Sequence, residues 1–417
     1  MRRIENIVLT VAAVVIGFSV LAYNLAGAIF PEALDVPKSS YLENRFYTGC
    51  TEITPKSVSS GEFQESLDAC LADHVPARDQ VVLYNAALQR ASVATMASIF
   101  GFDVYPTFLG SRYYVIPRDN LIVDRAEEQP ADSSQEELDA WVNTLNTAAQ
   151  NHPDIRIVYD CVARHDQSEA NPTYRYYSNR LNPTWAQENI IDRLDSRVDA
   201  FVDPVESYDE ILAEWYNADP HWTLKRALES YNKIAERLNL AVYPYDNPVV
   251  AVDSWYGGYA KNGLDLDVST KLEDLPIDFS QLSFYRLQEE GGGEISVGSR
   301  DGVLSGQVTP SDEVESMYYE YFGGGQMEVR NSGANNGRNV LVVTDSLSYS
   351  LTRFIASNYD QSTFILPGND HFGSSFEEYI ERYNPDDVIV LTHVSKYLSI
   401  AEFSPEFIGL PGAQSNK

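Results

Sequence analysis

Cysteine is scarce in this chain of 417 residues, which contains only Cys50, Cys70 and Cys161. Three cysteines are too few for a disulfide scaffold, and their spacing does not match that of metal ligands, so the sequence predicts no metal site. Cys50 and Cys70 flank a short polar segment and can pair outside the cytosol. The alternative is that all three are unpaired thiols.

Basic residues are also few: 30 lysines and arginines face 61 aspartates and glutamates, giving a formal net charge of −31. Neutralising phosphates needs a basic patch, so this balance argues against a nucleic-acid ligand. It also disfavours close adhesion to an anionic membrane surface. The composition is typical of a heavily hydrated secreted domain.

A long apolar run occurs at the N-terminus, where 24 uncharged residues from Ile7 to Phe30 follow Arg2 and Arg3. This run is long enough to cross a bilayer as a helix. The arginines place its start inside, so we expect a single-pass cell-membrane anchor with the remaining chain outside the cytoplasm. Small residues at 26–28 leave a cleaved signal peptide, and hence secretion, as the alternative.

The chain is too long for one small domain and predicts two globular units, or one large one with insertions. We expect an anchor at 1–30, a stalk and lead-in segment at 31–60, and the first part of the domain at 61–253. Glycine runs and acidic residues predict an irregular, β-leaning insertion at 254–335, and the domain then ends with 336–417.

Apolar periodicity predicts several elements. They are a helix ending near Ile99, a strand–turn–strand unit at Tyr113–Val123, a helix with Leu138, Trp141, Val142 and Leu145 on one face, a strand at Ile155–Tyr159, and a strongly amphipathic helix after Thr223. In the last segment, strands at 339–343, 362–366 and 387–392 alternate with helices, which predicts a parallel central sheet.

Ligands of such sheets bind at the carboxyl ends of the strands, and Asp345-Ser346 directly follows the strand at 339–343. A serine needs a neighbouring base to act as a nucleophile. One of only six histidines, His221, precedes the amphipathic helix, and Asp219 stands two residues earlier. In an extended segment these two side chains point to the same side. The sequence therefore predicts a Ser346–His221–Asp219 triad, with Trp222 as a packing residue or, less readily, a substrate platform.

These stretches resemble the DHHW proteins, which are relatives of the acetyltransferase domains used in alginate O-acetylation, within the wider SGNH hydrolase fold. The motif Thr-Asp-x-His-Trp is matched by residues 218–222, and Gly-Asp-Ser by 344–346. Three more matches are Glu43-Asn44-Arg45, the segment 73–79, and Asn384-Pro385-Asp386-Asp387-Val388. The motifs occur in the family's order between residues 40 and 395.

The resemblance implies a three-layer α/β/α fold in which Ser346 is nucleophile, His221 base and Asp219 the residue that orients the base. It requires no cofactor. Thr344 stands where the family has glycine, and we expect it to crowd the turn; Arg226-Ala227 replaces the usual Gly-Ala. Asn369 is a candidate oxyanion donor or else a turn residue.

In two of these matched stretches, at 43–45 and 73–79, we expect no catalytic residue. Arg45 and the pair Arg78-Asp79 are interpreted as structural ion-pair or capping residues.

Together these features predict a membrane-anchored extracellular serine esterase or O-acyltransferase acting on a cell-envelope polysaccharide. A transferase needs an acyl donor, which we expect from a membrane-bound partner protein. The alternative is a non-catalytic envelope protein that binds glycans or assists assembly and has kept the fold; its many tyrosines suit carbohydrate contact.

Overall fold

The structure is a computed structural model that describes most of the chain. The described residues are 18, 39–40, 42, 45–47, 54–61, 64, 72–73, 78–129, 135–287, 317–322, 326–367, 374–395 and 407–408. They form two compact units, residues 1–95 and 96–417.

In the first unit, most of the described residues lie in helices or in two short strands. Strands β1 (Ser39–Ser40) and β2 (Arg45–Phe46) pair antiparallel, and helix α2 (Pro55–Ser60) begins with a capping box at Thr54. Helix α4 (Arg78–Phe100) starts in this unit, and its first two residues pair, with Arg78 Nη1 donating to Asp79 Oδ1 at 3.1 Å. This contact agrees with the structural role expected for Arg78-Asp79.

A seven-stranded sheet organises residues 96–417, in the order β10-β11-β13-β12-β14-β6-β7. The five strands from β13 to β7 are parallel, whereas β10 and β11 add antiparallel at one edge. The strands of this sheet are β6 (Arg156–Val162), β7 (Val198–Asp203), β10 (Leu282–Arg286), β11 (Met327–Asn331), β12 (Asn339–Thr344), β13 (Gln361–Ile365) and β14 (Asp387–His393).

Smaller sheets join β3 (Tyr105–Pro106), β4 (Tyr113–Ile116) and β5 (Leu121–Asp124), and also β8 (Val249–Trp255) with β9 (Thr270–Asp274). The helices described in this unit are α5 (Gln135–Asn151), α6 (Pro183–Asn189), α7 (Tyr208–Glu214), α8 (Leu224–Leu238), α9 (Gly258–Asn262), α11 (Met317–Phe322), α12 (Thr352–Ala356) and α13 (Phe376–Tyr383). Short 3₁₀ helices include η1 (Pro117–Asp119), η3 (His165–Gln167), η4 (Tyr174–Tyr176), η5 (Ile191–Arg193) and η6 (Ser346–Leu351).

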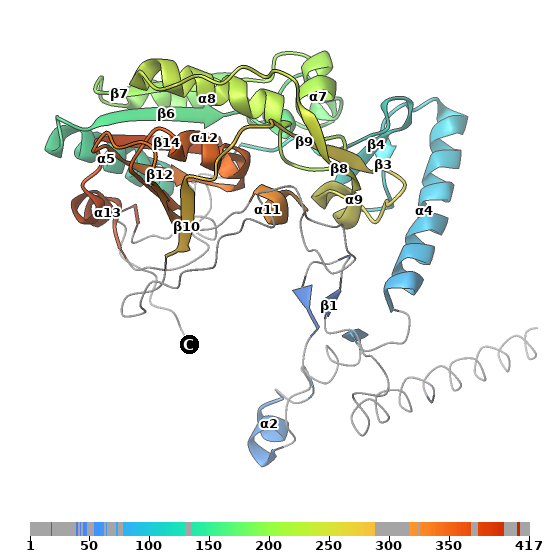
Figure 1. The fold of residues 1–417 in the computed structure, drawn as a ribbon. Helices are drawn as coiled ribbons and strands as arrows, with labels where there is room; N and C mark the ends of the chain where they lie inside the picture. The colour runs from blue at the N-terminus through green and yellow to red at the C-terminus, as the bar shows by residue number, and fades with distance from the viewer. Residues whose placement is uncertain are drawn as a thin grey trace, which may run out of the picture. The chain divides into compact units, whose positions relative to one another are not determined.

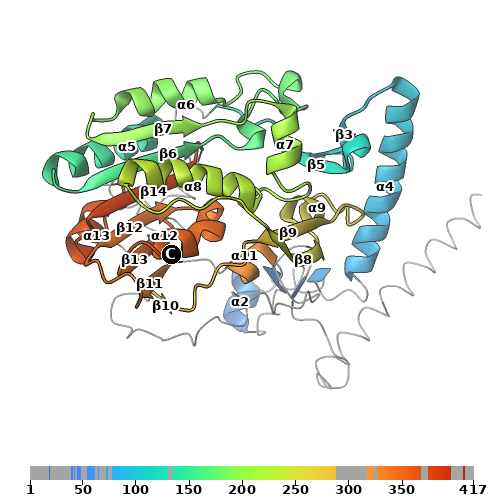
Figure 2. The same cartoon turned by 45° about the horizontal axis from the view of Figure 1, so that its top comes forward.

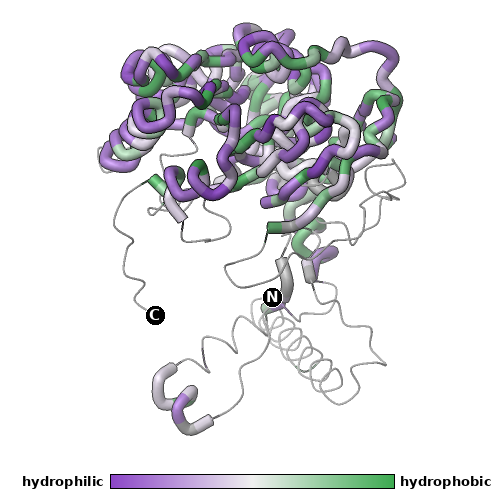
Figure 3. The backbone as a smooth tube through the Cα atoms, turned by 60° about the vertical axis from the view of Figure 1, so that its left-hand side comes forward, coloured by the Kyte–Doolittle hydropathy of each residue, from purple (hydrophilic) through white to green (hydrophobic). Residues whose placement is uncertain are grey.

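Helices cover both faces of the sheet, as Figures 1 and 2 show. Alternate residues of each central strand point to opposite faces, so Val340 and Val342 of β12 pack with α8 and α12, while Leu341 and Val343 pack with α5 and α13. Hydrophobic segments accordingly run through the interior and hydrophilic ones lie outside (Figure 3). The sheet and its flanking helices confirm the three-layer α/β/α arrangement.

The amphipathic helix predicted after Thr223 is α8, and its whole apolar stripe is buried. Thr223 stands at the N-cap position, but its side chain makes no capping hydrogen bond. The predicted strands and helices of the last segment occur as β12, α12, β13, α13 and β14.

One expectation needs correction. The range 254–335 is not only an insertion, because β10 and β11 within it form the antiparallel edge of the main sheet. Glycine runs and acids at 291–325 obscured two short strands whose pairing partners are distant in the chain. The sheet is therefore mixed rather than wholly parallel.

Several expectations lie outside the described residues. They concern the run Ile7–Phe30 apart from Phe18, the cysteines at 50 and 70, and Asn369. In the part that the structure does describe, no helix is sufficiently long and apolar to span a membrane.

A buried ion pair joins β9 to α12 in the larger unit. Arg353 Nη2 donates to both carboxylate oxygens of Asp274 at 2.8 Å, and Tyr321 of α11 donates its hydroxyl to Asp274 Oδ2 at 2.8 Å. Arg353 and Asp274 are 3% and 4% exposed, so neither charge has water as a substitute partner. Because Asp274 binds both Tyr321 of α11 and Arg353 of α12, it holds these two helices together.

Replacing Asp274 by alanine therefore leaves the Arg353 guanidinium buried and uncompensated. We expect Asp274→Ala to lower the free energy of unfolding by about 3–5 kcal/mol in a denaturant titration. The control is Asp253→Ala, which removes an exposed pair with Lys271 and should cost less than about 1 kcal/mol. Equal losses in the two variants would contradict the role assigned to Asp274.

Candidate active site

The loop between α7 and α8 closes on itself and presents residues 217–221 at its tip. Trp215 and Trp222 form an antiparallel bridge, and Tyr216 N–H donates to the His221 carbonyl at 3.1 Å. Thr223 N–H also donates to the Glu214 carbonyl at 2.8 Å. Because helices anchor both ends of the loop, the side chains at its tip have a fixed base.

Asp219 receives three N–H groups at this tip. Its Oδ1 accepts from the His221 backbone N–H at 3.0 Å and lies 2.5 Å from His221 Nδ1, while Oδ2 accepts from Gly258 N–H at 2.7 Å. The residue is 2% exposed. A carboxylate only accepts, so Nδ1 carries the proton and Nε2 of the neutral ring is left as a base.

His221 Nε2 lies 2.8 Å from Ser346 Oγ. Ser346 is partly exposed, whereas its neighbours Asp345 and Leu347 are buried. The serine hydroxyl is therefore both reachable from outside and positioned to give its proton to the imidazole. The structure brings all three predicted triad residues into one hydrogen-bonded chain; their catalytic roles remain a prediction.

Asp345, to which the sequence assigned no role, fixes the turn that carries Ser346. Its Oδ1 accepts from Leu347 N–H and its Oδ2 from His393 N–H, both at 2.8 Å. The first bond caps η6, and the second ties the end of β12 to the end of β14. The nucleophile thus stands where two central parallel strands end.

Thr344 does not crowd this turn as expected. The residue is fully buried and its hydroxyl donates to the Leu391 carbonyl at 2.8 Å, so the side chain is engaged with β14.

Trp222 is fully buried, and its indole N–H donates to the Leu347 carbonyl at 2.9 Å. This contact links the Asp–His loop directly to the serine turn. The packing interpretation therefore holds, and the ring has no exposed face on which a substrate could stack.

Tyr318 of α11 was missed by the sequence reasoning. Its ring stacks on the His221 imidazole with centroids 3.9 Å apart and planes inclined by 12°. Its hydroxyl donates to the Leu347 carbonyl at 3.1 Å or to Ser350 Oγ at 3.0 Å. Burial raises the pKa of Tyr318, so the hydroxyl keeps its proton. Tyr318 stands in an acidic, aromatic stretch beside Tyr319 and Tyr321, and nothing in that stretch distinguishes it from these neighbours.

Gly257 was also missed, although the Gly257-Gly258 pair is visible in the sequence. A Cβ added at Gly257 would lie 2.3 Å from the Ala218 carbonyl oxygen and 2.5 Å from Asp219 Cβ. At Gly258 the nearest atom to such a Cβ is Pro220 Cδ at an ordinary 3.4 Å. Close approach of the two backbones therefore requires glycine at position 257 only.

A second histidine lies behind the loop without joining the triad. His165 follows β6, and its ring centroid is 5.0 Å from that of Trp215 and 5.5 Å from that of Tyr259. Burial lowers the pKa of His165 to about 4, so the ring is neutral at pH 7. It packs the inner side of the loop as an aromatic ring.

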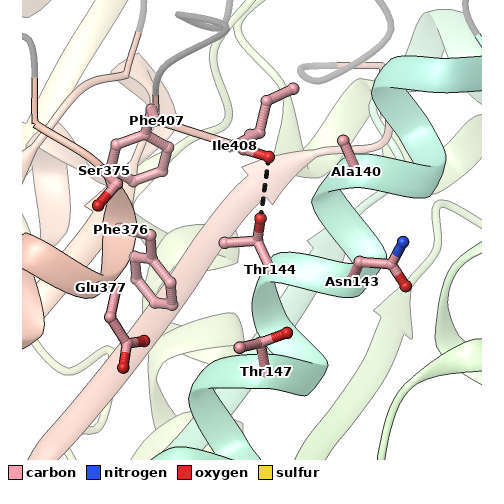
Figure 4. A pocket seen from close by; sticks show the side chains of 9 residues that line it. All are labelled: Ala140, Asn143, Thr144, Thr147, Ser375, Phe376, Glu377, Phe407 and Ile408. Carbon is pink, nitrogen blue, oxygen red and sulfur yellow. Dashed lines mark hydrogen bonds between the residues drawn. The ribbon is translucent and has the colours of Figure 1, made fainter. Parts of the chain in front are cut away.

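A cavity of about 400 Å³ lies between α5 and α13, beside residues 407–408 (Figure 4). None of its lining residues belongs to the triad. Among the described residues, no group of three or more His, Cys, Asp or Glu side chains could hold a metal ion.

Comparison with solved structures finds proteins with a similar fold. Bacillus cereus PatB1, solved with a sulfonyl adduct, is similar with a TM-score of 0.52 and 14% identity over 67% of this chain and 94% of that one. The solved neighbours include a DHHW family protein. It comes from Eubacterium siraeum and is 10% identical, with a TM-score of 0.52, over 73% of this chain and 97% of that one.

At such low identities these similarities show a shared fold, which confirms the fold expected from the DHHW motifs. No protein-family model matches the chain, and no curated protein sequence matches it.

The clash at Gly257 gives a sharp steric prediction. We expect Gly257→Ala to displace Asp219 and slow the labelling of Ser346 by a fluorophosphonate about 10²-fold, since misplacing a reacting group by about 1 Å costs that much. Gly258→Ala is the matched control, and its labelling rate should stay near that of the unchanged chain. Both should unfold cooperatively on heating. Equal rates in the two variants would show that the contact is not needed.

Tyr318 gives a second prediction at the same histidine. Tyr318→Leu removes the ring that restrains the imidazole and faces the cation formed during reaction, so fluorophosphonate labelling should slow about tenfold, as expected for a desolvated cation–π contact of about 1–2 kcal/mol. Tyr318→Phe keeps the ring and loses only the hydroxyl, and should label within about threefold of the unchanged chain. If Phe and Leu slow labelling equally, the hydroxyl rather than the stacked ring matters.

Proposed function

We propose that this chain is a serine-dependent O-acyltransferase or esterase acting on a cell-envelope polysaccharide, with acetyl as the acyl group. The observation that carries the proposal is the hydrogen-bonded chain from Asp219 through His221 to Ser346, with links of 2.5 and 2.8 Å. The bond from the Trp222 indole to Leu347 supports it, because that bond fixes the distance between loop and turn.

The first half of the reaction uses all three residues. Ser346 Oγ attacks the carbonyl carbon of the acyl donor, and its proton passes to His221 Nε2. The Asp219 carboxylate stabilises the imidazolium that forms. When the tetrahedral intermediate collapses, the imidazolium gives its proton to the leaving oxygen and an acyl-serine ester remains.

The second half decides between transfer and hydrolysis. A sugar hydroxyl or a water molecule gives its proton to His221 Nε2 while its oxygen attacks the acyl-serine. Collapse returns the proton to Ser346 Oγ and releases an acylated glycan or a free acid. In the transferase version, the acyl donor comes from a membrane-bound partner.

The proposed cellular location of the chain is the one expected from its N-terminal apolar run. We propose that residues 7–30 anchor the chain in the cell membrane, or are cleaved on export, and that the following residues act outside the cytoplasm. Acetylation of an envelope glycan needs an enzyme at that place.

The test is to measure turnover of a small acetyl ester with purified chain. Ser346→Ala and His221→Ala should each lower kcat about 10⁴-fold or more, because serine and base act as a unit. Asp219→Asn should lower it about 10⁴-fold, because an amide facing Nδ1 favours the wrong tautomer. Unchanged turnover in Ser346→Ala and His221→Ala would overturn the proposal.

Two further readouts separate the alternatives. Labelling by a fluorophosphonate that disappears in Ser346→Ala distinguishes an enzyme from a non-catalytic glycan-binding protein. A mass gain of one acetyl group on an added glycan, compared with release of acetate alone, distinguishes transfer from hydrolysis.

A further inference from the structure

Tyrosines and arginines gather at residues 174–177 with Tyr114, Arg125 and Arg180. We call this cluster the Tyr–Arg face. Its segment runs along β5 and the residues after it: Ala126 N–H donates to Thr173 Oγ1 at 2.8 Å, and Leu181 N–H donates to the Glu127 carbonyl at 2.8 Å. The face is therefore a built part of the fold.

The arginines of this face differ from others in the chain. Acids outnumber bases twofold, and other arginines pair with carboxylates, as Arg112 does with Asp124 and Arg226 with Asp203. Within the part of the chain that the structure describes, Arg125, Arg175 and Arg180 have no ion pair. Three cations without a carboxylate, gathered on one face of a chain with a net charge of −31, leave room for an external anion.

Each of these guanidinium groups instead lies over a tyrosine ring. The distance from Cζ to the ring centroid is 3.8 Å for Arg180 over Tyr174, 4.9 Å for Arg175 over Tyr176 and 6.0 Å for Arg125 over Tyr177. Stacking uses the flat side of a guanidinium and leaves its N–H groups available in the plane. Arg175 Nη2 donates to the Tyr176 hydroxyl at 2.8 Å, and Arg180 Nη1 donates to the Tyr174 carbonyl. The remaining N–H groups, above all those of the exposed Arg125 and Arg175, can bind a carboxylate or phosphate.

The tyrosines add the second half of a glycan site. Tyr176 is 49% exposed, and the hydroxyls of Tyr114 and Tyr177 are hydrogen bonded to each other at 2.7 Å, which fixes both rings. Rigid aromatic rings provide apolar contact for sugar rings at low entropic cost. Alternating aromatic and cationic groups are suited to a polysaccharide chain in which sugar rings alternate with anionic groups.

The face also connects to the proposed site through the fold. Ile122 of β5 donates its N–H to the Asn217 carbonyl at 2.8 Å, in the loop that carries Asp219. Arg125 lies three residues further along the same segment. The segment from Ile122 of β5 to Arg125, one residue beyond its end, thus links the loop of the triad to the Tyr–Arg face.

We infer that the Tyr–Arg face binds an anionic polysaccharide strand through its carboxylate or phosphate groups. This polysaccharide is the acyl acceptor or ester substrate of the proposed function. Its role as substrate rests on that proposed function, whereas its binding to the face does not. Binding to the face needs no catalysis.

The experiment measures binding of the full chain to polygalacturonate, to a poly(glycerol phosphate) and to neutral dextran by isothermal titration. We expect binding to one or both anionic polymers, weakened by salt, and none to dextran. Which anionic polymer binds identifies carboxylate or phosphate as the recognised group.

The test variant is the double substitution Arg125→Gln with Arg175→Gln, since both side chains are exposed and neither makes an ion pair with a residue that the structure describes. It should weaken binding about tenfold, which corresponds to about 1.4 kcal/mol in total for the two lost charge-assisted contacts at an exposed site. The matched control, Arg193→Gln with Arg197→Gln, changes the net charge equally on paired arginines and should bind as the unchanged chain does.

Turnover of a small acetyl ester separates this inference from the proposed function. The Arg125/Arg175 variant should keep it, whereas Ser346→Ala should lose it and still bind the glycan. Equal binding by the two double variants, equal binding of dextran, or binding of an acidic peptide in place of both glycans would overturn the inference. Glycan binding through Arg125 and Arg175 without any ester turnover would instead overturn the proposed function alone.

Discussion

The Asp219 carboxylate is the interaction on which the site depends. It accepts N–H groups from its own loop, from the His221 ring and from Gly258 at the start of α9. A buried carboxylate is costly unless it is fully hydrogen bonded, so these three donors must stay together. The same group therefore sets the tautomer of His221, shapes the loop and seats α9 against it.

Much of this arrangement was visible in the sequence because it depends on local pattern. Apolar periodicity predicted α8 and its buried stripe, and apolar runs predicted β12, β13 and β14. The position of Ser346 after β12, and the spacing of Asp219 and His221, followed from the same elements. The geometry of a strand end is short-range information. The extended segment expected for Asp219 and His221 was wrong, because residues 217–221 form a turn in which the His221 N–H donates to Asp219 Oδ1.

What the sequence did not reveal depends on distant contacts. Tyr318 stacks on His221 from a helix 97 positions later in the numbering, and nothing in its own neighbourhood marks it. Gly257 is needed because another backbone approaches it, which a single sequence does not display. The strands β10 and β11 pair at the sheet edge across a long connection, so glycine and acidic residues between them suggested an insertion.

Asp345 has a consequence for motion. Because its carboxylate ties Leu347 at the serine turn to His393 at the end of β14, the turn cannot open without disturbing two strands at the centre of the sheet. Amide groups there should exchange with solvent only through openings close to global unfolding. The nucleophile is thus tied to the centre of the sheet, and we expect any adjustment to a substrate to come from the surrounding loops.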